Sequence, residues 1–157
     1  MATHTATIEW RRNGAPFLDR QYSREHEWRF DGGAVVAASS SPHVVRVPLS
    51  NPANVDPEEA FVAALSSCHM LWFLDLAARA GYVVEQYTDR AEARMGRRDD
   101  GAEWIAKVVL APDVRFAGTQ KPADEAVRAL HHRAHEACFI ANSVRTEVSV
   151  AGTWTAP

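Results

Sequence analysis

The sequence predicts an α+β fold, and three observations lead to that class. Two segments, residues 56–80 and 123–137, have helical apolar patterns. Strand patterns surround both segments, and glycine-rich turn sequences join neighbouring strands into hairpins. Antiparallel hairpins with the helices set apart from them are typical of α+β proteins. With 157 residues the chain has the length of one domain, so we expect residues 1–157 to form a single domain.

Strand patterns dominate the first fifty residues. Residues 25–30 alternate between polar and apolar side chains, and the turn sequence Asp31-Gly32-Gly33 leads from them into residues 34–39. This arrangement predicts a β-hairpin. Further strands are expected at residues 5–10 and 44–47.

The clearest helix start in the sequence follows this region. Asp56 suits the N-cap, Pro57 suits the first helical position, and Glu59 completes a capping box. The apolar pattern then continues to Ala80, and Gly81 supplies the C-terminal stop. About 24 residues at ~1.5 Å each give a helix of about 36 Å.

This helix is apolar on nearly all sides, which predicts that it is buried all round. A chain of 157 residues has little material to cover such a helix, so we expect a partner chain. The segment is also long enough to resemble a membrane span, but Asp75 lies within it, and an unpaired acid is costly in lipid. We therefore expect the buried helix of a soluble protein and no membrane contact.

Strand patterns return after the long helix. Residues 82–95 are expected to form one long strand that pairs with residues 103–110 through a turn at Asp100-Gly101. Pro122 opens the second helix, from about Ala123 to Ala137, and a last strand is expected at residues 144–150. The apolar stripe of the second helix consists of Val127, Leu130 and Ala134.

Charge and cysteine content restrict the class of protein. Lys and Arg number 17 against 20 Asp and Glu, a net charge of -3 that argues against a nucleic-acid partner. The only cysteines, Cys68 and Cys138, are too few and too far apart for a secreted disulfide scaffold. Residues 1–15 contain no apolar signal-peptide core, so we expect a cytoplasmic location. Two thiols in a reducing compartment are core residues, metal ligands or redox groups.

The second helix also carries a candidate metal site. His131, His135 and Cys138 are spaced i, i+4 and i+7, which places them on one helical face. With Cys68 or His69 from the long helix they would complete a tetrahedral zinc site. The sequence lacks a short Cys-x-x-Cys pair, and a solvated histidine-rich face explains the same pattern. We expect no metal and no cofactor, and a non-redox metal- or small-ligand-binding protein that uses His131, His135 and the thiols is the alternative function.

Residues 55–69 (VDPEEAFVAALSSCH) resemble the OsmC/Ohr family of osmotically induced and organic-hydroperoxide-resistance proteins. In that family a Pro-Glu pair starts the central helix, and a cysteine follows ten residues after the Glu. Residues 135–143 resemble the family's second-cysteine segment. The resemblance implies an OsmC-like fold, with antiparallel β-hairpins around a long buried central helix plus a second helix. It also implies an intertwined homodimer with both active sites at the subunit interface.

The resemblance further implies a thiol peroxidase that reduces organic hydroperoxides to alcohols. Cys68 would be the peroxidatic cysteine, and Cys138 would resolve its sulfenic acid as a disulfide. Glu58 matches the acid that holds the catalytic arginine, for which Arg24 is the best candidate and Arg20 the second. An external dithiol, either a lipoylated protein or a small thiol, would then reset the enzyme.

The residue types agree with this chemistry. A thiol attacks a peroxide as the thiolate, and a nearby guanidinium favours that charged form at any working pH. An apolar pocket lined by aromatic side chains would favour organic hydroperoxides, and the candidates are Phe61, Trp72 and Phe139. Phe139 follows Cys138 where the commoner family form has proline, and Ser66-Ser67 precede Cys68 where alanines are usual. These departures indicate a divergent OsmC-like branch.

Overall fold

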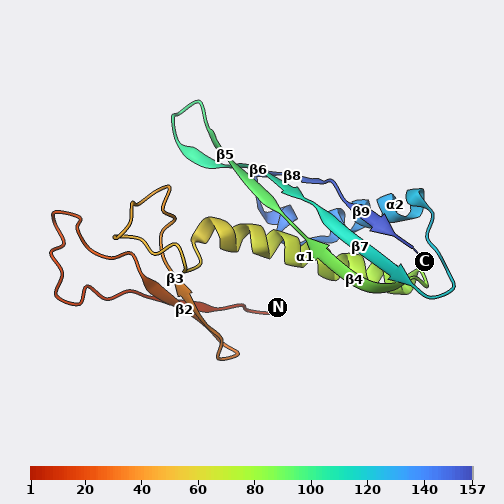
Figure 1. Ribbon diagram of the computed structural model, residues 1–157, viewed down its shortest axis with the longest axis horizontal. Coiled ribbons are helices and arrows are strands. Elements are labelled where there is room, and N and C mark those ends of the chain that lie inside the picture. The colour runs from red at the N-terminus through yellow and green to blue at the C-terminus, as the bar shows by residue number, and fades with distance from the viewer. Residues whose placement is uncertain (157) are drawn as a thin grey trace. The chain divides into compact units, whose positions relative to one another are not determined.

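The computed structural model of the chain describes residues 1–156 (Figure 1). The chain forms two compact units, Met1–Ala60 and the part from Phe61 on, and each is described by itself. The expectation of a single domain stays a prediction.

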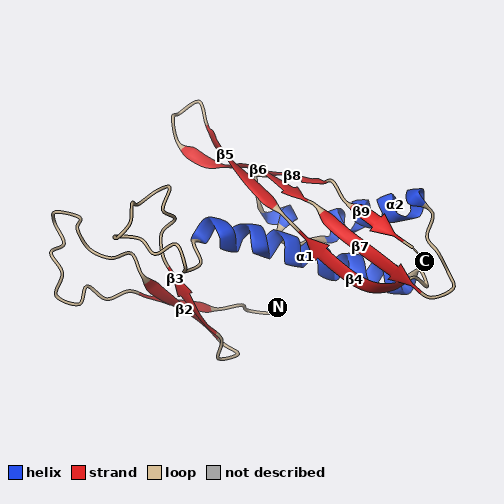
Figure 2. Cartoon of the chain, viewed as in Figure 1, coloured by secondary structure: helices blue, strands red, loops and turns tan. Residues whose placement is uncertain are grey.

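The N-terminal unit contains a three-stranded antiparallel sheet in the order β1-β2-β3 (Figure 2). The hairpin predicted from residues 25–39 is confirmed, and so is the first strand. The strand expected at residues 44–47 is wrong. These residues form turns, because the N–H groups of Val44 and Val45 donate to the Ser41 carbonyl and are not free to pair with a strand. The strands are β1 (Ala6–Glu9), β2 (His26–Phe30) and β3 (Val35–Ala38).

The long helix α1 (Pro57–Arg79) begins and ends as its capping residues predict. The Glu59 N–H donates to Asp56 Oδ1 at 2.8 Å, and the Asp56 N–H donates to Glu59 Oε2 at 3.1 Å. This reciprocal pair is the expected capping box. After the last turn, Gly81 adopts a positive φ of 82°, a conformation that glycine reaches without a steric cost.

Burial of α1 within one chain is confined to one stripe, which consists of Leu65, His69, Phe73, Leu76 and Ala77. Within one chain α1 is therefore not buried on all sides as predicted, since Leu71 on its open side is 61% exposed. The partner that would cover the open side stays a prediction. By length and composition alone, α1 would also be able to cross a membrane.

The second unit contains two three-stranded sheets, in the orders β4-β7-β9 and β5-β6-β8. The β6–β8 and β7–β9 pairs are parallel, whereas the β4–β7 and β5–β6 pairs are antiparallel. The bounds are β4 (Val83–Asp89), β5 (Glu92–Arg97), β6 (Glu103–Leu110), β7 (Pro112–Ala117), β8 (Glu147–Val150) and β9 (Thr153–Thr155).

The predicted long strand at residues 82–95 is wrong, because the chain leaves one sheet after β4 and enters the other at β5. Asp89 marks this crossing: its carboxylate accepts hydrogen bonds from the Ala111 N–H at 2.7 Å and from the Ser66 hydroxyl at 2.5 Å. The turn at Asp100-Gly101 and the strand at residues 103–110 are confirmed. Strands β7 and β9 were not predicted.

Helix α2 (Asp124–Ala137) is confirmed, and a short 3-10 turn, η1 (Ala141–Ser143), follows it. The predicted apolar stripe of α2 packs against α1 and β7, where Phe73, Val114 and Phe116 are buried. A second cluster contains Leu65, Val108 and Leu110. The α+β class is confirmed, with two α-helices and three small sheets in the described residues.

Candidate functional site

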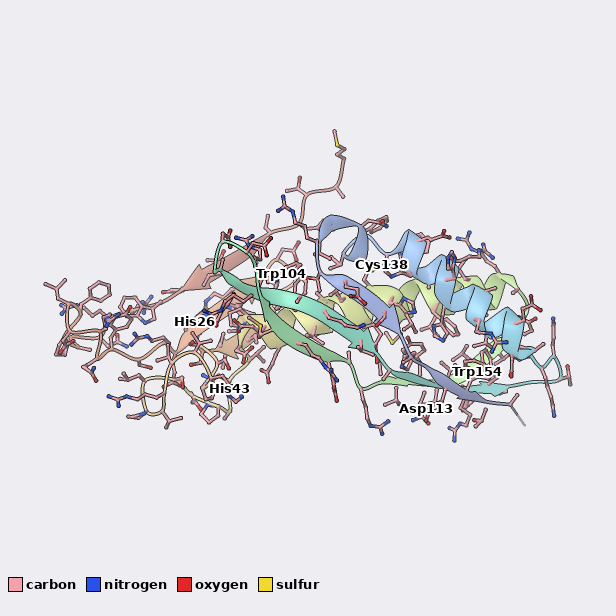
Figure 3. All side chains as sticks on the ribbon, turned by 90° about the horizontal axis from the view of Figure 1, so that it is seen from above. His26, His43, Trp104, Asp113, Cys138 and Trp154 are labelled. Carbon is pink, nitrogen blue, oxygen red and sulfur yellow. The ribbon has the colours of Figure 1, made fainter. Side chains whose placement is uncertain are left out.

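The structure brings the two cysteines together although 70 positions separate them in the sequence. Cys68 is half-buried in the middle of α1. Cys138 is the C-cap of α2, at the end of that helix in Figure 3. The Cys68 thiol lies close enough to the Cys138 thiol to raise its pKa, and both cysteines are free thiols. Two sulfur atoms in this position are able to act on one another chemically.

The environment of the Cys138 thiol favours its neutral form. Cys138 is 1% exposed. This burial and the nearby Cys68 thiol raise the pKa of Cys138 to about 11. The Ala141 N–H donates to Cys138 Sγ at 3.4 Å, and this bond lowers the pKa of Cys138 by a smaller amount. Cys138 is therefore a protonated thiol near neutral pH, and the half-buried Cys68 is the more accessible sulfur.

Asn142 fixes the turn that carries Cys138. Its side-chain amide donates to the Glu136 carbonyl at 2.7 Å and to the Cys138 carbonyl at 3.0 Å, and its backbone N–H donates to the Cys138 carbonyl. These bonds satisfy carbonyls that the end of α2 leaves without a helical partner. This role was not predicted from the sequence, although Asn142 stands four residues after the C-cap Cys138, and asparagine is common in turns.

We expect Asn142→Ala to slow disulfide formation between Cys68 and Cys138 and to shift its equilibrium toward the two thiols. The alanine cannot make the two amide bonds, so Cys138 is held less firmly beside Cys68. Each bond is worth about 1 kcal/mol, which predicts roughly a fivefold to thirtyfold change in the disulfide equilibrium. Equilibration in defined dithiol–disulfide buffers measures it.

The matched control is Ser143→Ala, which removes the hydroxyl bond to the Phe139 carbonyl in the same turn without touching Cys138. An equal shift in both variants would assign the effect to the stability of the turn as a whole and would contradict a specific role of Asn142.

A buried histidine pair lies one residue beyond Cys68. His69 Nε2 and His131 Nδ1 are 3.0 Å apart, and the rings stack with 10° between their planes. Burial lowers the pKa of each histidine to about 4, and for His69 the nearby His131 and His135 add to the effect. Both rings are therefore neutral at neutral pH. The signal for this pair was present, because each histidine falls on the buried stripe of its helix.

The metal alternative receives no support from this geometry. His131 is engaged with His69, and Cys138 has already left the helix, so the expected i, i+4, i+7 face is not formed. Across residues 1–156, no group of three or more His, Cys, Asp or Glu side chains is arranged to hold a metal ion.

Arg24 and Glu58 line one cavity of about 480 Å³ in the N-terminal unit, together with the aromatic side chains of Trp10, Phe17 and Tyr22. The Arg24 guanidinium lies 3.9 Å from the centre of the Tyr22 ring and donates to the carbonyls of Arg20 and Tyr22. Among the described residues no ion pair joins it to Glu58, so the expected guanidinium–carboxylate pair is not formed. Arg20, the second candidate, is exposed. The aromatic group around Arg24 was not predicted from the sequence.

The three predicted substrate contacts lie in different surroundings. Phe61 packs on the buried cluster of Leu65, Val108 and Leu110. Trp72 and Phe139 make an edge-to-face contact, with ring centres 5.6 Å apart. Phe139 is 70% exposed next to Cys138, so this aromatic pair offers an apolar surface close to the thiols.

Comparisons with known proteins give matches that cover most of the chain. The OsmC-like protein family matches residues 50–151. An OsmC-like protein of unknown function from Vibrio cholerae O1 biovar eltor is 56% identical, with a TM-score of 0.94, and the match covers 97% of this chain and 99% of that one. No curated protein matches the chain.

More distant solved structures share the fold alone. An OsmC-like protein from Mycoplasma pneumoniae is 10% identical, with a TM-score of 0.74 and 98% of each chain covered. An organic hydroperoxide resistance protein from Elizabethkingia anophelis is 18% identical, with a TM-score of 0.67, covering 100% of this chain and 98% of that one.

Proposed function

Because this chain belongs to the OsmC-like protein family, we propose that it is a thiol peroxidase that reduces organic hydroperoxides to alcohols. The observation that carries the proposal is the proximity of the Cys68 thiol in α1 to the Cys138 thiol at the end of α2, which raises the pKa of Cys138. The name of the Elizabethkingia anophelis protein, which shares the fold, supports the substrate class.

The proposed reaction has three steps. The Cys68 thiolate attacks the terminal oxygen of the hydroperoxide, the O–O bond breaks, and the alkoxide leaves and takes up a proton as the alcohol. Cys68 is then a sulfenic acid, and Cys138 attacks it to form the disulfide with release of water. An external dithiol finally reduces the disulfide to two thiols and is itself oxidised to a disulfide.

The two cysteines have different roles in this proposal because their environments differ. Cys68 is the more accessible sulfur, so an incoming hydroperoxide meets it first. Cys138 is buried, with a raised pKa, and a neutral thiol is a poor nucleophile toward peroxide. Cys138 therefore acts second, when the Cys68 sulfenic acid is already beside it.

The remaining predicted residues enter the proposal as follows. The family resemblance assigns the role of a cation that favours a thiolate to Arg24 and the role of the acid that balances it to Glu58, and both roles stay predictions. Trp72 and Phe139, with Phe61, provide apolar contacts for the organic part of the substrate. A second copy of the chain covers the open side of α1, and the reductant is a lipoylated protein or a small thiol in the cytoplasm.

The experiment that tests the proposal counts free thiols after one equivalent of cumene hydroperoxide is added to the reduced protein. We expect both thiols of each chain to disappear together, with one cumyl alcohol formed for each pair lost. An equivalent of hydrogen peroxide is expected to react more slowly, since it lacks an apolar part. Unchanged thiol counts after complete mixing would refute the peroxidase proposal.

A further inference from the structure

A second cavity in the unit from Phe61 on contains neither cysteine. It has a volume of about 390 Å³ and is bounded by α2, by β8 and by the chain from β8 into β9. Trp154 in β9 belongs to this lining and is labelled in Figure 3. This volume lies within the range of small-molecule sites in proteins. Its lining residues are Arg128, His131, His132, His135, Val148, Val150, Ala151, Gly152 and Trp154.

The walls of this cavity divide into an apolar and a basic part. Val148, Val150 and the Trp154 indole form the apolar part, and the indole is held in place because its Nε1–H donates to Asp124 Oδ1 at 3.0 Å. The other part comes from α2 and contains one arginine and three histidines. No Asp or Glu belongs to the lining, although Glu136 approaches His132 to 3.5 Å from outside it.

Two polar groups on the α2 wall are without a partner in the described residues. The Arg128 side chain makes no ion pair there. His131 is 6% exposed, and its Nε2 is buried without a hydrogen-bond partner. A buried polar atom without a partner destabilises the protein, and a ligand oxygen bonded to it would remove that cost. Because Nε2 is buried, a ligand oxygen reaches it only when side chains at this wall move.

From these features we propose that the cavity binds a small organic carboxylate. Its carboxylate lies on the α2 wall, between Arg128 and the His131 ring, and its apolar body lies on Val148, Val150 and the Trp154 indole. A guanidinium carries donors only, and donors arranged around a wall without acids select an anion. The apolar opposite wall disfavours a fully hydrated inorganic anion such as phosphate, because such an anion gains nothing from it.

The hydrogen bond between the two histidines gives this site a distinctive property. Both rings are neutral, so one proton lies in the bond between His69 Nε2 and His131 Nδ1. If His69 carries that proton, His131 has its own proton on Nε2 and donates to the ligand. A bound carboxylate selects this arrangement, because an anion requires a donor. Ligand binding therefore fixes the tautomer of His69, the residue next to Cys68.

Isothermal titration of the intact protein with octanoate tests the proposal, with 1-octanol as an uncharged probe of the same length. We expect saturable octanoate binding, and Arg128→Gln should weaken it about tenfold or more through loss of a charge-assisted contact. Arg128 is exposed, so this variant keeps the fold. The matched control is Arg133→Gln, an exposed position of α2 outside the lining, and its affinity should equal that of the unaltered protein.

The imidazole ¹⁵N spectrum supplies the second measurement, and octanoate should place the His131 proton on Nε2. Three results would each overturn the proposal: no saturable binding of octanoate, equal affinity for 1-octanol, or equal affinity in Arg128→Gln. A His131 Nε2 without a proton in the octanoate-bound protein would do so as well. The readouts are binding and tautomer, so they do not depend on whether the chain reduces hydroperoxides.

Discussion

Cys68→Ser is expected to reduce organic hydroperoxide consumption to the uncatalysed rate, whereas Cys138→Ser should retain the first step. A serine hydroxyl is far less acidic than a thiol and does not form the nucleophile that a peroxide requires. In Cys138→Ser the Cys68 thiol remains, and the buried position beside it holds a hydroxyl that cannot form a disulfide. The reaction should therefore stop at the Cys68 sulfenic acid.

Single-turnover measurements without reductant distinguish these outcomes. Cys138→Ser should release one alcohol per chain and become reactive toward a sulfenic-acid trap such as dimedone. Cys68→Ser should release none and keep its remaining thiol. The two variants serve as controls for one another, since each removes one sulfur from the same contact. If Cys68→Ser released alcohol as fast as the unaltered protein, the assignment of Cys68 as the attacking sulfur would be contradicted.

The elements that were predicted correctly are those whose signals are local. The capping box of Asp56 and Glu59 and the stop at Gly81 specify α1 through contacts within a few residues. The break between β4 and β5 was missed because the Asp89 carboxylate fixes it through Ala111 and Ser66, which lie more than twenty residues away. Strands β7 and β9 pair across similar distances, and no periodicity in a short segment reveals its partner.

The candidate site shows the same division. Cys68 and Cys138 were identified by their residue type and position, and the structure places them together. The role of Asn142 depends on a turn geometry that begins only after α2 ends, and the His69–His131 pair depends on the register between two helices. In each case the chemistry of one residue is decided by a neighbour that its own segment does not specify. The Arg24–Glu58 pair remains the part of the prediction that the structure does not form.

Acidification is expected to destabilise the protein through the buried histidine pair. Histidine in an unfolded chain has a pKa near 6.5, and folding lowers the pKa of His69 and of His131 to about 4. Above pH 6.5 both histidines are neutral in the folded and in the unfolded chain, so the free energy of unfolding does not depend on their titration. Below pH 6.5 the histidines of the unfolded chain become protonated while the folded pair stays neutral. The free energy of unfolding therefore decreases with falling pH until the folded pair protonates near pH 4.

The magnitude follows from the same shift. Each histidine contributes a slope of up to about 1.4 kcal/mol per pH unit in this window, and about 3 kcal/mol over the whole of it. Between pH 6.5 and 5 most carboxylates stay ionised, so the histidine contribution can be read separately there. Urea unfolding at fixed protein concentration, repeated across this interval, measures the slope. Fixed concentration is needed because any self-association adds to the apparent stability.

Two substitutions make the origin of this slope testable. His131→Gln keeps a polar side chain at the position but removes one titrating group and the partner that depresses its neighbour, so the slope should fall by half or more. His132→Gln, one residue further along α2, removes a histidine whose side chain is 72% exposed, and the slope should stay unchanged. Because burial is the first cause of both shifts, the contrast between buried His131 and exposed His132 isolates the contribution of the buried pair. Equal slopes in the two variants would show that the acid sensitivity arises elsewhere in the chain.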